Sequence, residues 1–181
     1  AYKKVVSNKG VAGVDGITIE EEFDYLKENK DRILKQIRRR RYKTQPVKRV
    51  QIPKENGKKR NLGIPTVTDR IIQQAIVQVI SPIFEKQFNE NSFGFRPNRS
   101  CEQAVIKALE YLNEGYEWIV DIDLERFFDT VNQDRLITII GKTIKDGDVV
   151  SLIRKYLSAG VMEKGIVKAT EVGTPQGGNL S

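Results

Sequence analysis

Histidine is absent from this 181-residue chain, and cysteine, methionine and tryptophan each occur once. Without histidine the chain cannot form Ser-His or Cys-His nucleophile pairs, and the common zinc sites are also excluded. The single cysteine, Cys101, cannot form an internal disulfide, which is typical of a reducing compartment. Any chemistry must therefore use carboxylates, lysine, tyrosine or a bound hard cation.

Long apolar runs are also missing. The mean hydropathy is −0.46, and Gln, Lys or Glu interrupts each apolar stretch after a few residues. A membrane-spanning helix needs about 20 consecutive apolar residues, and the sequence contains no such stretch. The first four residues lead into polar sequence rather than into the apolar part of a signal peptide. We therefore expect no association with a membrane.

Positive charge is concentrated in one block. Residues 32–60 contain 13 Lys and Arg against one acid, Glu55, although the net charge of the whole chain is only +7. The other 152 residues therefore carry a net charge of −5. One basic block on a mildly acidic chain is typical of a surface that binds nucleic acid or polyphosphate. The run of four arginines at residues 38–41 favours this interpretation over the alternative, a helix face exposed only to solvent.

Local patterns predict a mixed order of helices and strands, which is the α+β class. Thr18 and Glu21 fit a capping box that begins a helix leading into the arginine run, and Asn56-Gly57 predicts a hairpin turn between two strands. Ser100 is expected to cap a helix that extends to Leu112. The other expected elements are a helix after Pro65 capped by Thr68 or Asp69, helices near 133–144 and 148–157, a strand at 118–123, and a hairpin at 160–172.

Two aspartates, Asp121 and Asp123, lie in the expected strand at 118–123. Side chains of a strand alternate between its faces, so both carboxylates would point to one face. Burying them beside apolar neighbours would cost free energy unless a cation compensated their charge. Oxygen ligands suit Mg²⁺. The alternative is a strand end with one exposed acid and one helix cap.

In order along the chain, five segments resemble the sequence blocks of group II intron-encoded reverse transcriptases. They are an N-terminal extension block at 8–18, a first fingers motif at 52–70, a second block at 93–100, the palm motif A at 120–131 and motif B at 173–181. The resemblance implies a right-hand polymerase fold made of fingers and a partial palm, with helices, β-hairpins and an antiparallel palm sheet. It also implies four segments: fingers with the N-terminal extension at 1–112, the palm segment with motif A at 113–131, further helices and a hairpin at 132–168, and the palm segment with motif B at 169–181.

The resemblance also implies roles for single residues. Asp123 matches the catalytic aspartate that binds both Mg²⁺ ions of a two-metal site, and the carbonyl of Ile122 or Leu124 would add a ligand. The residues up to Ser181 would leave this two-metal site incomplete. The residues that match nucleotide-binding positions are Lys54 and Arg60 at the triphosphate, Phe128 as the steric gate against a ribose 2′-hydroxyl with Phe127 as the alternative, and Pro175 and Gln176 beneath the nascent base pair. The residues expected to bind RNA or to support the fingers are Arg38, Arg39, Arg40, Arg41, Lys43, Arg96 and Arg99.

The family resemblance implies an RNA-directed DNA polymerase that also acts as a maturase in splicing and retrohoming of its intron. Its expected partners are group II intron RNA, an RNA template with a DNA primer, and deoxynucleoside triphosphates, in a bacterial cytoplasm or an organelle; a homodimer is compatible with the resemblance. The family's Tyr-x-Asp-Asp motif does not occur up to Ser181, so we expect these residues alone to be inactive as a polymerase. Two alternatives stay open: an RNA-binding splicing cofactor with a non-functional polymerase site, and a retron or CRISPR-associated reverse transcriptase.

Overall fold

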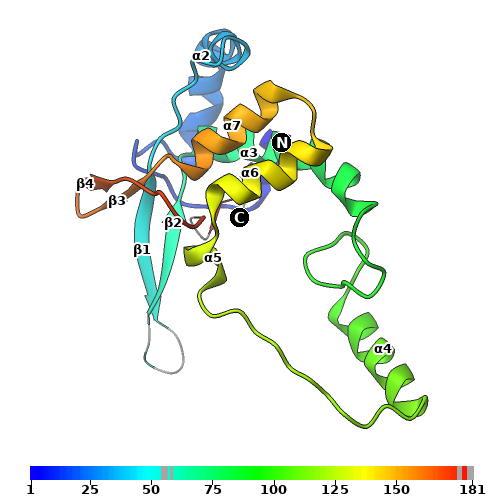
Figure 1. Cartoon of the computed structure of the whole chain (residues 1–181). Coiled ribbons are helices and arrows are strands. Elements are labelled where there is room, and N and C mark those ends of the chain that lie inside the picture. The colour runs from blue at the N-terminus through cyan, green and yellow to red at the C-terminus, as the bar shows by residue number, and fades with distance from the viewer. Residues whose placement is uncertain (54–56, 58, 175–176, 179–181) are drawn as a thin grey trace. The chain divides into compact units, whose positions relative to one another are not determined.

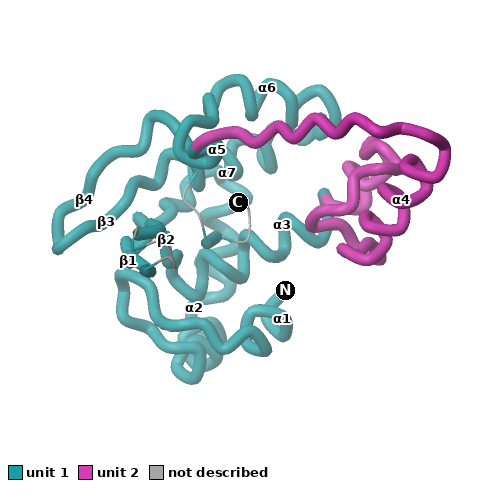
Figure 2. Tube along the Cα trace, turned by 90° about the horizontal axis from the view of Figure 1, so that it is seen from below, with its two compact units in different colours: residues 1–80, 126–181 teal, residues 81–125 magenta. Residues whose placement is uncertain are grey.

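The computed structural model describes residues 1–53, 57, 59–174 and 177–178, and it divides into two compact units (Figure 1). One unit contains residues 1–80 and 126–181, and the other contains residues 81–125 (Figure 2). One boundary lies inside helix α3 (Val67–Glu85), between Ile80 and Ser81 and one residue before Pro82. A proline inside a helix removes one backbone hydrogen bond and kinks or breaks the helix, which is consistent with a boundary at this point.

Most helices belong to the first unit. Besides the first part of α3 they are α1 (Tyr2–Ser7), α2 (Ile19–Arg38), α5 (Phe127–Thr130), α6 (Gln133–Thr143) and α7 (Gly147–Leu157). The capping box predicted for α2 is confirmed, because Thr18 Oγ1 accepts from the Glu21 backbone N–H while the Glu21 carboxylate accepts from the Thr18 N–H at 2.9 Å. Helix α2 ends at Arg38, where basic side chains complement the negative end of the helix dipole.

A four-stranded mixed sheet lies in the same unit, in the order β2-β1-β3-β4. Its strands are β1 (Val47–Pro53), β2 (Lys59–Ile64), β3 (Val161–Glu163) and β4 (Ile166–Lys168). Both predicted hairpins are confirmed: β1 pairs with β2, and β3 pairs with β4, in antiparallel fashion. The sequence did not reveal that β1 and β3 pair in parallel, with Val47 opposite Val161. This pairing joins two hairpins that are more than 90 residues apart in the chain.

The hydrophobic core of the first unit lies among α2, α3, α6 and α7. Its buried residues are Ile33, Tyr42, Ile76, Ile153, Tyr156 and Leu157. A smaller cluster of Val5, Ile19 and Val67 joins α1 to the starts of α2 and α3. No helix in the described part of the chain is long and apolar enough to cross a membrane.

Asp69 is buried in this core, which the sequence did not predict. Its Oδ1 accepts hydrogen bonds from the hydroxyls of Tyr42 (2.8 Å) and Tyr156 (3.1 Å), and its Oδ2 accepts from the Gln45 N–H (3.0 Å). Thr66 instead occupies the capping position expected for Thr68 or Asp69, since its hydroxyl accepts from the Asp69 N–H. Burial raises the pKa of the Asp69 carboxyl, and the hydrogen bonds from the tyrosines and from Gln45 act in the opposite direction.

Glu22 is a second buried carboxyl in the first unit, at 0% exposure. The Thr68 hydroxyl donates to its Oε1 at 2.8 Å, whereas Oε2 has no hydrogen-bond partner among the described residues. Burial raises the pKa of Glu22 to about 7, and the bond from Thr68 only partly offsets this effect. The neutral carboxyl is therefore the form that suits the folded interior.

The second unit contains helix α4 (Cys101–Asn113), which begins at Ser100 as predicted. The Ser100 hydroxyl accepts from the Gln103 N–H, and the Gln103 side chain accepts from the Ser100 N–H, which completes a capping box. Arg96 fixes the loop before α4: its guanidinium donates to Glu85 Oε1 at 2.7 Å and to the carbonyls of Asn89 and Ser92.

The prediction of a strand at residues 118–123 is wrong. These residues have no strand assignment, and Trp118 is 93% exposed. Their alternating apolar pattern has the period of a strand, but a strand forms only when a neighbour takes up its backbone hydrogen bonds. No described strand pairs with this segment. The antiparallel palm sheet expected around it is therefore not formed by the described residues.

The raised pKa of Glu22 predicts that the chain loses stability as the pH rises. The folded state binds the Glu22 proton more tightly than the unfolded state does, so the free energy of unfolding falls between about pH 4.5 and about pH 7. Glu22→Gln should remove this part of the pH dependence. Urea unfolding at pH 5 and at pH 7.5 measures the effect, with the exposed Asp24→Asn as the control. An unchanged pH dependence in Glu22→Gln would contradict the assignment.

Candidate functional site

The glycine-rich segment that begins at Gly173 is attached to α5 through the backbone. The Thr174 N–H donates to the Phe128 carbonyl at 2.7 Å, and the Gly173 N–H donates to the Val131 carbonyl at 2.8 Å. Gly173 has a φ of +84°, and a Cβ at this position would lie 2.8 Å from the Phe128 carbonyl oxygen. Only glycine tolerates both the left-handed backbone and this close approach. The structure therefore brings together Phe128 and the start of the 173–178 segment.

The same segment also lies against the end of β2 and against α3. A Cβ at Gly177 would lie 2.8 Å from the Gly63 carbonyl oxygen, and a Cβ at Gly178 would lie 3.0 Å from Gln73 Oε1. Gly177 has a φ of +110°, which again requires glycine. The backbone at residues 173–174 thus contacts α5, and residues 177–178 approach the end of β2 and α3.

Gln133, at the start of α6, supports this assembly from the interior. Its side-chain amide Nε2 donates to the carbonyls of Gly173 (2.9 Å), Leu157 (3.0 Å) and Thr170 (3.3 Å). The Gln133 side chain is buried, and its bonds to the Leu157 and Gly173 carbonyls are buried as well, so these two carbonyls depend on it as a partner. Nothing in the sequence distinguishes Gln133 from an ordinary polar residue in the first turn of a helix, because all three acceptors are distant in the chain.

The two candidate gate residues, Phe127 and Phe128, form an edge-to-face pair with ring centroids 5.7 Å apart. Phe127 is exposed and Phe128 is partly buried. Helix α5 begins after Arg126, which has a left-handed φ of 52° and forms an ion pair with Asp129. Asn132 caps α6, because its side chain accepts from the Arg135 N–H.

Asp121 and Asp123 lie in the second unit and are exposed. Among the residues with described positions, no three acidic, histidine or cysteine side chains gather to form a metal cluster. The donors that this segment offers, two carboxylates and the carbonyls of Ile122 and Leu124, are nevertheless oxygen atoms of the kind that Mg²⁺ prefers. These oxygen donors are therefore suitable ligands for Mg²⁺. Further carboxylates are needed to complete the ligand set.

Of the other nucleotide-binding candidates, only Arg60 is among the residues that the structure describes. Arg60 lies on β2 opposite Ile52 and is exposed. Lys54, Pro175 and Gln176 lie outside the described residues.

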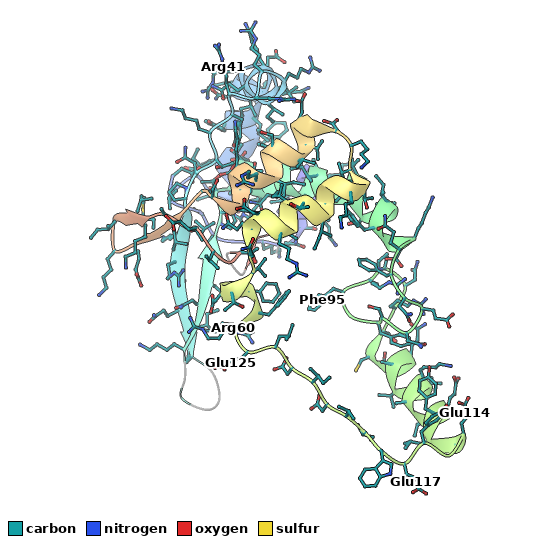
Figure 3. All side chains as sticks on the ribbon, in the orientation of Figure 1. Arg41, Arg60, Phe95, Glu114, Glu117 and Glu125 are labelled. Carbon is teal, nitrogen blue, oxygen red and sulfur yellow. The ribbon has the colours of Figure 1, made fainter. Side chains whose placement is uncertain are left out.

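The expected RNA-binding residues lie in different environments. Arg38 and Arg39 end helix α2 and are exposed, whereas Arg40 forms an ion pair with Asp148 at the start of α7. Arg41 and Lys43 are exposed on the following loop. Figure 3 shows Arg41 and Arg60 toward opposite ends of the first unit, so the two ends of the basic block are far apart in the structure.

Arg96 and Arg99 belong to the second unit. The side chain of Arg96 is only 8% exposed, and its guanidinium also lies over the Phe88 ring, 5.3 Å from the centroid. This geometry agrees with a role in supporting the loop. Arg99 lies over the ring of Phe93 at 5.6 Å.

Comparison with known proteins agrees with the order of the sequence blocks. Residues 52–181 match the family model described as reverse transcriptase (RNA-dependent DNA polymerase). The chain is 40% identical to the group II intron-encoded protein LtrA of Lactococcus lactis subsp. cremoris, over 100% of this chain and 30% of that protein. It is 39% identical to protein YkfC of Escherichia coli K12, over 77% of this chain and 38% of that protein. The chain therefore spans about a third of the length of these relatives.

A likeness in fold extends to a solved structure of a partial Cas6-RT-Cas1–Cas2 complex. The TM-score is 0.61 with 20% sequence identity, over 99% of this chain and 30% of the other. At this identity the likeness supports the fold, which is that of fingers and palm in a reverse transcriptase.

Gln133→Met should loosen the start of the 173–178 segment. Methionine is similar in length but donates no hydrogen bond, so buried carbonyls lose their donor at a cost of about 1–3 kcal/mol. We expect faster hydrogen exchange at the amides of Gly173 and Thr174, measured by NMR. Tyr156→Phe is the matched control, because it removes one buried hydrogen bond to Asp69 that does not touch this segment. Equal acceleration at both amides in the two variants would show that the Gln133 contact is not local.

Proposed function

This chain belongs to the reverse transcriptase (RNA-dependent DNA polymerase) family, and from this membership we propose that it forms the fingers and part of the palm of a group II intron-encoded enzyme that copies RNA into DNA. The observation that carries the proposal is the 2.7 Å hydrogen bond from the Thr174 N–H to the Phe128 carbonyl. It joins the segment of the candidate steric gate to the segment that resembles motif B, as a shared nucleotide pocket requires. The 40% identity to LtrA along the whole chain supports the intron-encoded branch.

In this proposal the side chains of the chain bind and orient the reactants. Arg60 and Lys54 neutralise the triphosphate, and Pro175 and Gln176 support the nascent base pair from below. Phe128 contacts the sugar and excludes a 2′-hydroxyl. Asp123, with the carbonyl of Ile122 or Leu124, would hold Mg²⁺, which supplies charge neutralisation and activation of the primer 3′-hydroxyl when bound. Phosphoryl transfer depends on positioning and on charge neutralisation rather than on a covalent nucleophile, so residues of these types suit the reaction, with further carboxylates needed to complete the metal site.

The proposal includes a maturase role in which the same protein binds its intron RNA, in a bacterial cytoplasm or in an organelle. The exposed basic residues at the end of α2 and on the following loop support RNA binding, because phosphate contacts dominate the affinity of proteins for nucleic acids. An RNA-binding splicing cofactor without polymerase activity is the second candidate. The two differ in whether Asp123 is needed for function, since binding of RNA alone does not require a catalytic carboxylate.

Asp123→Asn should abolish primer extension while leaving RNA binding nearly unchanged. The substitution removes the negative charge that holds Mg²⁺ but leaves the size of the side chain unchanged. The test requires a protein that carries these residues together with the rest of the polymerase, assayed with an RNA template, a DNA primer and deoxynucleotides. Asp121→Asn is the matched control, because its carboxylate lies two residues away in the same exposed segment and should be dispensable. Equal loss in both variants, or loss of RNA binding together with extension, would contradict the role of Asp123.

Phe128→Ala should weaken discrimination against ribonucleotides. Without the ring, a 2′-hydroxyl no longer meets a steric barrier, and we expect the preference for deoxynucleotides to fall at least about tenfold, or about 1.4 kcal/mol. Steady-state kcat/KM for dATP and ATP measures the preference. Phe127→Ala tests the neighbouring ring of the same pair and should leave the preference unchanged. If Phe127→Ala alone reduces the preference, Phe127 is the gate.

A further inference from the structure

The loop after α2 forms a ridge between two hollows in the surface of the first unit. One hollow has a volume of about 520 Å³ and extends along α2 toward Asp15 and Thr66. The other has a volume of about 730 Å³ and is more open, with Lys155 on its wall. Arg41, Tyr42 and Lys43 line both hollows. Both volumes lie in the range of about 300–1,000 Å³ that is typical of small-molecule sites.

The backbone of this ridge is fixed from several directions. The Arg41 N–H donates to the Gln36 carbonyl at 2.8 Å, and the Lys155 ammonium donates to the Tyr42 carbonyl at 3.1 Å. The Thr44 hydroxyl donates to the Lys155 carbonyl at 3.0 Å. The buried ring of Tyr42 adds its bond to Asp69. The loop therefore presents its outward side chains in a preorganised arrangement, which lowers the entropy cost of binding a ligand.

Arg41 and Lys43 are exposed on either side of the buried Tyr42. Neither has a carboxylate partner within salt-bridge distance in the described part of the chain, in contrast to Arg40, which is paired with Asp148. Exposed cations that have no carboxylate partner attract an anion. Their arrangement on a fixed backbone points to an anionic ligand.

The walls of the first hollow add aromatic and polar groups. Tyr25 lines it, and its hydroxyl accepts a hydrogen bond from Arg32, which lines the same wall. Aromatic faces bind unstacked bases, with an affinity of about 1–3 kcal/mol per base in single-strand binding proteins. Asp15 is the acidic group on this wall and opposes an anion.

We propose that this ridge binds single-stranded RNA, with a phosphodiester group at Arg41 and Lys43 and the two adjoining nucleosides in the two hollows. A duplex keeps its bases stacked and paired, so it cannot place single nucleosides in separate hollows. The proposal deepens the RNA-binding part of the proposed function and does not depend on polymerase activity. It also assigns binding to Arg41 and Lys43 rather than to the arginine run as a whole.

The test compares two double variants that remove the same charge. Arg41→Gln with Lys43→Gln changes the ridge, and Arg38→Gln with Arg39→Gln changes the adjacent, exposed end of α2. Fluorescence anisotropy measures binding of the 181-residue chain to a labelled, unstructured RNA of about 12 nucleotides, over a series of salt concentrations. We expect the ridge variant to lose at least about tenfold in affinity and to reduce the salt slope by about 0.7, because one phosphate charge is no longer neutralised. The α2 variant should lose less than about threefold.

Two further arms make the result specific. Asp15→Asn should raise affinity, since it removes the acidic group but keeps an oxygen that can accept from the Ile17 N–H. A hairpin duplex of similar length should bind more weakly than the single strand. Equal losses in the two double variants, tighter binding of the hairpin, or no binding by the unmodified chain would each overturn the proposal. Absence of primer extension by the unmodified protein would instead contradict the proposed polymerase. The anisotropy assay does not depend on that activity, because it measures binding and involves no chemistry.

Discussion

The buried carboxylate of Asp69 is the interaction on which the first unit depends. It holds the hydroxyls of Tyr42 and Tyr156 and the Gln45 N–H, and so connects α3 to the basic loop and to α7. Both connected segments lead directly into strands: the loop precedes β1, and α7 precedes β3. The Val47 N–H, at the start of β1, donates to the Gly160 carbonyl at 3.0 Å just before β3. Each of these hydrogen bonds contributes about 0.5–1.5 kcal/mol, and removal of one partner leaves a buried polar group without its bond. The parallel pairing of the two hairpins is thus anchored by one carboxylate.

Sequence patterns identified the parts of this unit that form locally. The capping boxes at Thr18 and Ser100 and the hairpins at Gly57 and at Lys164-Gly165 involve residues within a few positions of each other, and each is present. Contacts between distant segments left no such signal. From the sequence, Asp69 was predicted as a possible helix cap. Its actual hydrogen-bond partners lie 24–87 residues away in the chain, so no local pattern indicated them. The opposite error occurred at residues 118–123, where a correct period of alternation predicted a strand although no described neighbour pairs with it. Periodicity indicates a side-chain pattern, whereas a strand also requires backbone partners.

In the basic block, too, the amino-acid composition did not indicate how the individual side chains are placed in the structure. The four arginines at 38–41 are contiguous in sequence, but a turn after α2 gives them different environments. Arg38 ends the helix, Arg40 is in an ion pair, and Arg41 lines the two hollows. The positive φ of 56° at Arg40 is what changes the direction of the chain there. The number of basic residues predicted a surface that binds a polyanion. The ion pairs of the structure then show which of these cations lack a carboxylate partner in the described part of the chain.

The two candidate surfaces of the first unit differ in how they are built, and this difference has consequences for mutation. The nucleotide side depends on backbone contacts at Gly173 and Gly177, where any Cβ would lie within 3 Å of a carbonyl oxygen. Side-chain changes there disturb the position of whole segments, so their effects should extend to α5 and β2 together. The ridge instead presents exposed side chains on a backbone that is fixed independently by Tyr42, Thr44 and Lys155. Charge can therefore be removed from the ridge without moving its backbone, which allows binding to be separated from folding on that surface.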